Sequence, residues 1–256
     1  MMSAFPGSTS VSFLEVYSDL APDGIRGGTP HMHLVSTEAY LVIAGRGAVQ
    51  TITSAGFAEQ QLSAGSVVWF TPGTIHRAVN YGALQMVVLM SNAGLPEAGD
   101  AVMTFPPEVV TDPDAYARAA GLGATDSDRP SRAAQRRDRA VHGFLQLKGA
   151  IASGDQAALT AFYQAAASLV RSRAPKFTEL IAAGPLAQAE RSLAASAALA
   201  LGDGSWLLDG YIQQAEASSG EPRFGMCGRL RTYTMPSGDG SGGAGQPGDP
   251  RGPAAR

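Results

Sequence analysis

Short runs of strand-forming residues, punctuated by Gly and Pro, fill the first third of this chain. Between residues 11 and 91 these runs are rich in Val, Ile, Tyr, Phe and Thr, as in 40–43, 49–52, 67–70 and 84–90. Many short strands separated by turn signals are typical of a β-sandwich or a β-barrel. The pattern predicts that residues 1–105 form a β domain, either a sandwich or a barrel.

A helical region is predicted to follow, over residues 106–217. Apolar residues recur at helical spacing between 141 and 181, and Ser153-Gly-Asp separates two of these stripes as a helix stop followed by an N-cap. Gly184-Pro185 is predicted to end a third helix, before an Ala-rich helix over 186–201. Because apolar stripes must be buried, we expect this region to pack on itself and on the barrel or a second subunit.

Strand-like sequence returns near the C-terminus. Residues 224–235 predict a late strand within a segment 218–236 that could pack back on the barrel. Residues 237–256 are rich in Gly, Pro and Ser and lack large apolar side chains, which predicts a disordered tail. The expected fold class is therefore α+β, with the barrel first and the helices after it.

Composition narrows the range of partners. The chain has 256 residues and a formal net charge of −3, too small to indicate a nucleic-acid or membrane partner. The densest basic cluster is predicted to be a solvated helix face and comprises Arg132, Arg136, Arg137 and Arg139. Cys227 is the single cysteine, so no intrachain disulfide can form. With no signal-peptide pattern, a cytoplasmic protein is expected.

Three of the four histidines lie in two short motifs at spacings that suit metal binding. His31 and His33 share one face of a strand, because side chains alternate along it. Glu38 has the opposite parity, so a bulge or tight turn across 35–37 must restore its inward direction. A turn at Pro72-Gly73 would bring His76 in from another strand. Three imidazoles and a carboxylate, with positions left open, suit one divalent Fe, Mn, Ni, Co or Zn ion.

These motifs resemble the two motifs of the cupin superfamily. His31, His33, Glu38 and Gly45 match His-x-His, four residues, Glu, six residues, Gly; Gly65, Pro72-Gly73, His76 and Asn80 resemble the second motif. Thr71 and Ser66 stand where Pro and Asp are common, and the opening Gly of the first motif is displaced, but no ligand position is lost. The resemblance implies a double-stranded β-helix, a jelly-roll barrel, holding one metal ion on His31, His33, Glu38 and His76.

Other residues of the barrel receive more modest roles. Tyr40 and Val42 share the face of Glu38 and are predicted to line the pocket beside it. Trp69 is predicted to be a core residue, and Asn80 is expected to stabilise a turn through hydrogen bonds.

Two classes of function fit these observations. The first is a metal-dependent enzyme acting on a small organic molecule, either dioxygenase-like, hence an oxidoreductase, or, as second choice, isomerase-like. The alternative is a non-enzymatic module that binds or senses a small molecule and uses its helices as a partner or homodimer surface. The cupin fold hosts both classes, so the resemblance alone does not choose between them.

Overall fold

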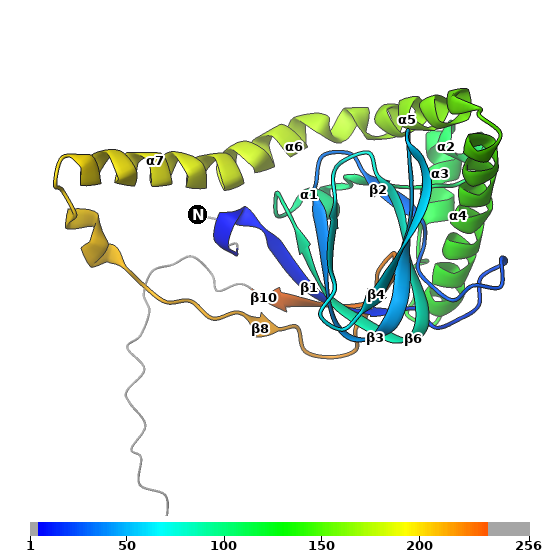
Figure 1. Cartoon of the computed structure of the whole chain (residues 1–256), viewed down its shortest axis with the longest axis horizontal. Helices are drawn as coiled ribbons and strands as arrows, with labels where there is room; N and C mark the ends of the chain where they lie inside the picture. Colours follow the sequence, from blue (N-terminus) through cyan, green and yellow to red (C-terminus); the bar gives the residue numbers. More distant parts are fainter. Residues whose placement is uncertain (1–4, 235–256) are drawn as a thin grey trace, which may run out of the picture.

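A computed structural model describes residues 5–234, and the predicted disordered tail, 237–256, lies outside the described residues. The β part is a jelly-roll barrel, as predicted (Figure 1). Its strands are β1 (Ser10–Val16), β2 (His31–His33), β3 (Glu38–Thr53), β4 (Gly56–Ser63), β5 (Val67–Phe70), β6 (Ile75–Met90), β7 (Ala101–Met103), β8 (Glu216–Ala217), β9 (Arg223–Phe224) and β10 (Gly228–Thr234).

Two long strands, β3 and β6, run the length of the barrel and hold it together. They pair antiparallel from Glu38↔Met90 to Ile52↔Ile75, with register shifts between 42 and 47. At the bend, Gly45 has a φ of 75°, and a Cβ there would overlap the backbone of Ala83. Only glycine combines this backbone conformation with so close an approach. The bend divides β3 and β6 between two facing sheets. In one sheet, the first half of β3 and the second half of β6 pair with β5 and β1, and β10 extends β1. In the other sheet, the second half of β3 and the first half of β6 pair with β4 and β2.

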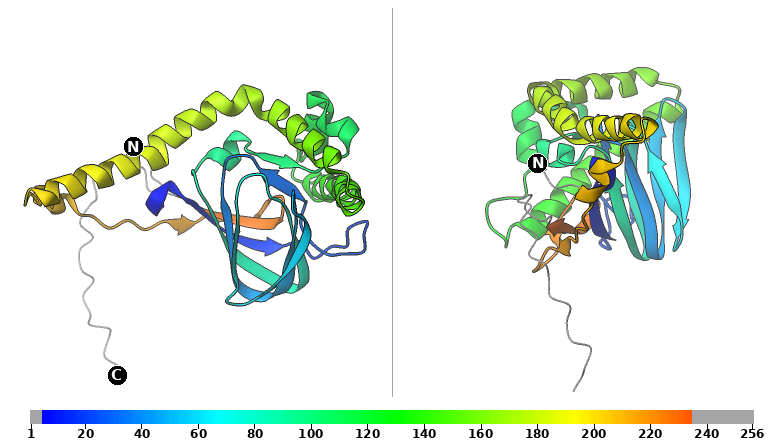
Figure 2. Two further views of the ribbon diagram at one scale, coloured as in Figure 1. Left: turned by 45° about the horizontal axis from the view of Figure 1, so that its top comes forward. Right: turned by 90° about the vertical axis from the view of Figure 1, so that its left-hand side faces the viewer.

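The helical elements are η1 (Pro6–Ser8), α1 (Leu95–Ala98), α2 (Pro107–Val110), α3 (Pro113–Ala120), α4 (Arg129–Ala152), α5 (Gln156–Val170), η2 (Arg171–Arg173), α6 (Ala174–Ile181), η3 (Ala182–Leu186), α7 (Ala187–Ala200) and η4 (Ser205–Asp209). Helices α2, α4 and α5 lie against one side of the barrel (Figures 1 and 2). One apolar cluster joins Met32, Ile52 and Ile75 of the barrel to Phe144 and Phe162 of the helices. Strand alternation explains the contact, because Met32 points away from the side that His31 and His33 face.

The predicted break between the first two long helices is confirmed. Helix α4 ends at Ala152, and the Asp155 carboxylate caps α5 by accepting hydrogen bonds from the backbone of Ala157 and Ala158. The predicted end at Gly184-Pro185 is wrong. The helix widens there into a π turn, η3, which accommodates the Pro185 ring, and continues into α7.

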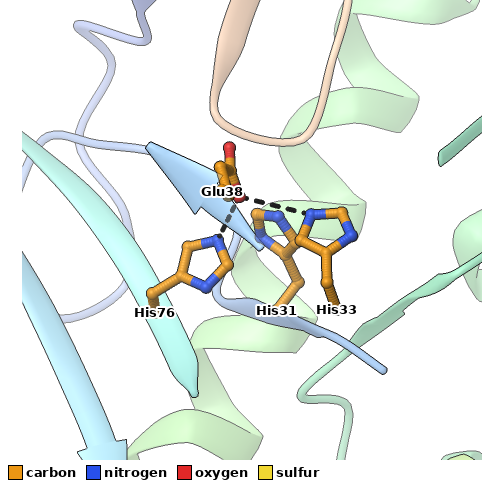
Figure 3. Close-up of side chains that lie close together, drawn as sticks. All are labelled: His31, His33, Glu38 and His76. Carbon is orange, nitrogen blue, oxygen red and sulfur yellow. Dashed lines mark ion pairs between the residues drawn. The ribbon is translucent and has the colours of Figure 1, made fainter. Parts of the chain in front are cut away.

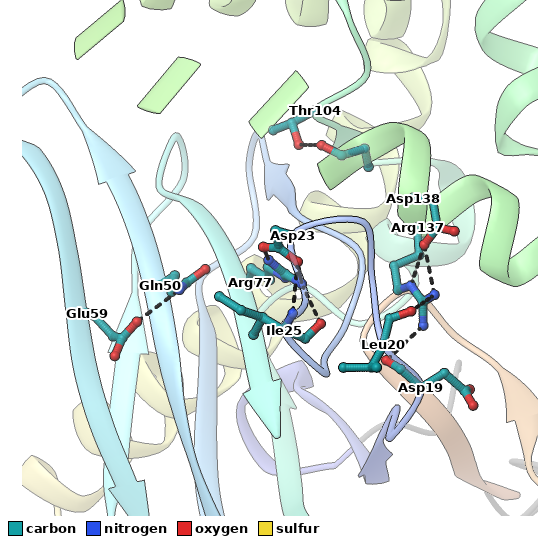
Figure 4. A network of polar contacts seen from close by, with 11 residues as sticks. Asp19, Leu20, Asp23, Ile25, Gln50, Glu59, Arg77, Thr104, Arg137 and Asp138 are labelled. Atoms are coloured by element: carbon teal, nitrogen blue, oxygen red, sulfur yellow. Dashed lines mark hydrogen bonds and ion pairs between the residues drawn. The ribbon is translucent and has the colours of Figure 1, made fainter. Parts of the chain in front are cut away.

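The basic cluster on α4 is only partly solvated, contrary to the prediction. Arg136 and Arg137 are buried. Arg136 donates a hydrogen bond to the carbonyl of Gly225 (2.6 Å). Arg137 donates to the carbonyls of Asp19 and Leu20 (3.2 and 2.8 Å) (Figure 4). A long cationic side chain with several donors can satisfy more than one loop carbonyl at once.

The C-terminal segment returns to the barrel after the helices. Strand β10 pairs antiparallel with β1, from Ser12↔Thr232 to Val16↔Gly228. The turn before it lies against the barrel, where Thr29 N–H donates to Met226 and Tyr17 N–H donates to Cys227. Cys227 thereby joins the apolar interior of the barrel. Among residues 5–234, no helix has the length and apolar character needed to cross a membrane.

Candidate metal centre

The four predicted ligands, His31, His33, Glu38 and His76, come together inside the barrel (Figure 3). His31 and His33 lie on β2, Glu38 is the first residue of β3, and His76 lies near the start of β6, in register with His31. Residues 34–37 belong to no strand, so the chain turns there and Glu38 faces inward despite its parity. One potential ligand atom from each residue lies within 4.8 Å of all the others, and all four side chains are buried.

Backbone carbonyl oxygens orient two of the three imidazoles, those of His31 and His76. His31 Nδ1 lies 2.9 Å from the carbonyl oxygen of Thr29, and His76 Nδ1 lies 3.0 Å from that of Thr74. A carbonyl oxygen can only accept, so each Nδ1 carries the proton and donates it. The Nε2 atom of each ring is then left with a lone pair, which is the form that binds a metal ion.

The ligand atoms fit a metal ion because they lack other partners. Glu38 Oε2 lies 3.1 Å from His76 Nε2 and 3.3 Å from His33 Nε2 (Figure 3). Glu38 Oε2 and His76 Nε2 are both fully buried, and neither has a hydrogen-bond partner among the described residues. Buried polar atoms without partners are costly, and converging lone pairs repel one another. A cation between them would remove both costs, and the donor set of nitrogen and oxygen is one that transition metals accept.

Electrostatics couple the same groups. Burial and the charges of His76 and His33 lower the pKa of His31 well below its usual range. Burial alone would lower the pKa of His33, but the carboxylates of Asp100 and Glu38 raise it to about 9. Burial would raise the pKa of Glu38, but His33 and His76 hold it well below the usual range. Because this pKa lies above neutral pH, a metal ion that binds His33 through Nε2 would have to displace a proton from the ring.

Asp100 is a buried carboxylate beside the candidate site that the sequence did not predict. It is fully buried, and its Oδ1 accepts hydrogen bonds from the backbone N–H groups of Leu34 and Val35 (3.1 and 2.8 Å). Its Oδ2 accepts from Ser36 N–H (3.0 Å) and lies 3.4 Å from His33 Nδ1. The carboxylate thus anchors the turn between His33 and Glu38 and backs the His33 ring. No local motif marks it, since it lies in the loop before β7, far from both ligand motifs in sequence.

The two predicted pocket residues lie in the barrel interior. Tyr40 and Val42 are both buried within an apolar cluster that also contains Phe70, Met86 and Cys227. The ring of Tyr40 lies 6.4 Å from that of His76, and its hydroxyl lies 3.6 Å from Cys227 Sγ. Burial, and the nearby groups of Cys227 and Glu38, raise the pKa of Tyr40 well above its usual range. Its hydroxyl therefore stays protonated and can donate a hydrogen bond.

Two further barrel predictions have opposite outcomes. Asn80 is confirmed as a turn-stabilising residue, because its Oδ1 accepts from the N–H groups of Gly82 and Leu84 and its Nδ2 donates to Val16. The prediction that Trp69 is a core residue is wrong. Its side chain is 69 % exposed on the outer side of β5, since Val68 and Phe70 take the inward positions.

A jelly-roll barrel with three histidines and a glutamate converging inside it defines the class: a β-barrel protein with a candidate metal site. Residues 2–113 match the family model of the cupins. This part of the chain is therefore a cupin domain, as the two motifs predicted. No curated protein matches the chain.

Three solved structures are similar to part of the chain at low sequence identity. An uncharacterised conserved protein with a double-stranded β-helix domain from Klebsiella pneumoniae is 18 % identical, covers 32 % of this chain and 64 % of its own, and has a TM-score of 0.25. A variant of Streptomyces PAC13 with uridine is 17 % identical over 37 % of this chain and 66 % of its own, with a TM-score of 0.29. CapF, a capsular polysaccharide assembling protein of Staphylococcus aureus, is 23 % identical over 32 % and 23 %, with a TM-score of 0.25.

The matched part therefore spans less than two thirds of each of these three chains.

Proposed function

We propose that His31, His33, Glu38 and His76 bind one divalent transition metal ion and that the chain is a metal-dependent enzyme acting on a small organic molecule. The observation that supports this most is the convergence of buried ligand atoms without hydrogen-bond partners, backed by acceptors that set the imidazole tautomers. Fe, Mn, Ni, Co and Zn all suit a set of three nitrogens and one oxygen. Four protein ligands leave room in the coordination shell for a small molecule.

A bound ion would supply a Lewis acid or, if it changes valence, a redox centre. The barrel itself keeps bulk water away from the cluster, since all four ligands and Tyr40 are buried. The Tyr40 hydroxyl is placed to donate a hydrogen bond to a molecule next to Glu38, and Val42 would form part of the apolar wall. We propose an oxidoreductase as first choice and an isomerase as second.

The second candidate is a non-enzymatic module that binds or senses a small molecule. One observation favours it: the segment after α6 exposes many large apolar side chains, as a partner surface would. We further propose a cytoplasmic location, because the single cysteine precludes an intrachain disulfide, and an assembly of two copies.

Metal analysis of the purified protein tests the site. After expression in metal-supplemented medium, we expect close to one ion per wild-type chain and a clear loss in His76→Ala. His142→Ala is the matched control, because His142 is the one histidine outside the cluster and is exposed. Circular dichroism verifies that both variants are folded. Equal metal content in wild type and His76→Ala would contradict the assignment.

A substrate screen separates the two candidate functions. Metal-loaded protein is incubated with a panel of small organic acids, sugars and nucleosides, with and without air. Turnover that disappears in His76→Ala supports the enzyme, and turnover that also needs air supports an oxidoreductase. Saturable binding of a compound without turnover supports the binding module instead.

A further inference from the structure

One face of the barrel carries an apolar surface that the described residues leave largely uncovered. It lies on the outer side of the sheet β5-β3-β6-β1, where side chains alternate with those that point into the core. The strand register aligns Phe13, Val87, Leu41 and Val67 in one row and Val11, Leu89, Ala39 and Trp69 in the next. We call these eight residues, together with Ile43, the outer sheet face.

This surface differs from the opposite side of the barrel. There, the outward side chains of Met32, Ile52 and Ile75 are buried under α4 and α5. On the outer sheet face, Trp69, Val67 and Ile43 are 69 %, 56 % and 46 % exposed, and the other six residues are partly exposed. A polar exterior would be expected if this face met only water.

A second apolar surface lies on the segment that follows α6. We call residues 186–212 the arm: it comprises α7, η4 and the chain around them, and it extends past the barrel on the side of β1 and β10 (Figures 1 and 2). None of the residues of α7 is buried. The exposed large apolar side chains of the arm are Leu186, Leu193, Leu199, Leu201, Trp206, Leu207, Leu208, Tyr211 and Ile212, and Leu208 and Ile212 exceed 89 %.

The arm is held away from the outer sheet face of its own chain. Its base rests on η1, which contacts both η3 and α7. Because η3 continues straight into α7 without a break, the helix leads outward instead of folding back over the sheet (Figure 1). Two exposed apolar surfaces thus remain on one chain, more than a monomeric soluble protein usually shows.

We propose that a second copy of this chain docks on the outer sheet face and that the arm of each copy packs across the outer sheet face of the other. A two-fold contact of this kind is self-complementary, so it buries both surfaces of both copies at once. A stable interface usually involves roughly 20–30 residues from each partner. The arm and the outer sheet face, together with the polar residues next to them, supply a similar number from each copy. The inference is independent of the metal site.

The tryptophans make the contact measurable. The chain has two, and Trp69 lies on the outer sheet face while Trp206 lies on the arm. Association buries both indole rings, so their emission should shift to the red when the full-length protein is diluted below the dissociation constant. Sedimentation or light scattering at the same concentrations should show a change from twice the chain mass to the chain mass.

Single substitutions on each surface test the two halves of the contact. Trp69→Glu on the sheet and Leu193→Asp on the arm should each give monomers at concentrations where the wild type is dimeric. Thr178→Asp on the exposed side of α6, before the arm, and Gln61→Glu on the exposed side of β4 are matched controls that should stay dimeric. Unchanged circular dichroism and metal content in all four variants exclude unfolding as the cause.

Cross-linking shows whether the arm of one copy contacts the outer sheet face of the other copy or that of its own chain. A mixture of differently tagged Trp69→Cys and Leu193→Cys proteins should form a mixed disulfide on mild oxidation, because native Cys227 is buried. A monomeric wild type would overturn the proposal, and so would a dimer that both surface variants leave intact. A disulfide that forms only within a chain carrying both substitutions would also overturn it, because the arm would then cover its own sheet.

Discussion

Asp100 carries the most specific prediction at the scale of single residues. Its two oxygens serve three backbone N–H groups of the turn and face His33 Nδ1. In Asp100→Asn, an NH2 group replaces one of the two oxygens. Its hydrogens would then face a backbone N–H group, either that of Ser36 or those of residues 34–35, and two donors cannot bond each other. The turn would shift, and His33 would lose the carboxylate that orients its ring.

Asp100→Asn should therefore weaken metal binding by about 10–100-fold, the usual effect of removing a partner behind a ligating histidine. Competition with a chromophoric chelator measures the affinity. Glu97→Gln is the matched control, because it removes an exposed carboxylate three residues away. If Asp100→Asn and Glu97→Gln bind metal equally well, Asp100 does not position the ligand.

The sequence motifs predicted the four candidate metal ligands but not the carboxylate that holds one of them in place. His31, His33, Glu38 and His76 were predictable because ligands on short strands and tight turns keep a characteristic spacing. Asp100 was not predictable, since a carboxylate that bonds a turn 64–66 residues away leaves no local pattern. The prediction that Trp69 is a core residue failed because apolar character alone does not show which of the two faces of a sheet is covered.

At the scale of elements, the contact of α4 with the barrel yields a test with an internal control. Gly143 lies where α4 passes over the chain between β7 and α2, and a Cβ there would overlap the carbonyl oxygen of Thr104. Gly149 lies two turns later in the same helix, and a Cβ there would meet open space. The two positions have the same helical backbone but opposite surroundings.

Gly143→Ala should destabilise the protein by about 1–3 kcal/mol, because backbone must move to accommodate the methyl group. Gly149→Ala should stabilise it by about 0.5–1 kcal/mol, because alanine favours the helix and nothing opposes it. Urea denaturation of both variants measures the free energies of unfolding. A stabilising Gly143→Ala would show that α4 does not approach Thr104 this closely.

The helix boundaries illustrate what local signals can decide. Asp155 was predictable as an N-cap because its carboxylate bonds N–H groups only two and three residues ahead. Gly184-Pro185 predicts a helix end, but the π turn over 182–186 accommodates the proline ring and the helix continues. The burial of Arg136 and Arg137 depended on loops that come more than 80 residues away in sequence.

At the scale of the whole molecule, the barrel and the helical layer share one apolar cluster. Phe144 of α4 is fully buried in it, together with Ile52 and Ile75 from the barrel and Phe162 from α5. Neither part could expose this cluster without losing the burial that stabilises both. We therefore expect the barrel and helices to unfold as one cooperative unit.

Phe144→Ala tests this expectation and should cost about 3–5 kcal/mol of stability. Far-ultraviolet circular dichroism follows the helices, and histidine-bound cobalt absorbance follows the barrel site. Coincident transitions by both probes are expected in wild type and variant. Separate transitions, with only the helical signal shifted by Phe144→Ala, would show that the helices form an independent unit.

The sequence by itself determined the elements whose signals are local: the short strands of the barrel, the break between α4 and α5, and the spacing of the four candidate ligands. These follow from side-chain alternation, capping and turn chemistry, which act over a few residues. The tertiary structure alone decided which faces are covered, why Asp100 is buried behind His33, and where α7 goes. These outcomes depend on which segments distant in sequence come into contact. A short stretch of chain does not determine its own burial, because other segments provide the atoms that cover it.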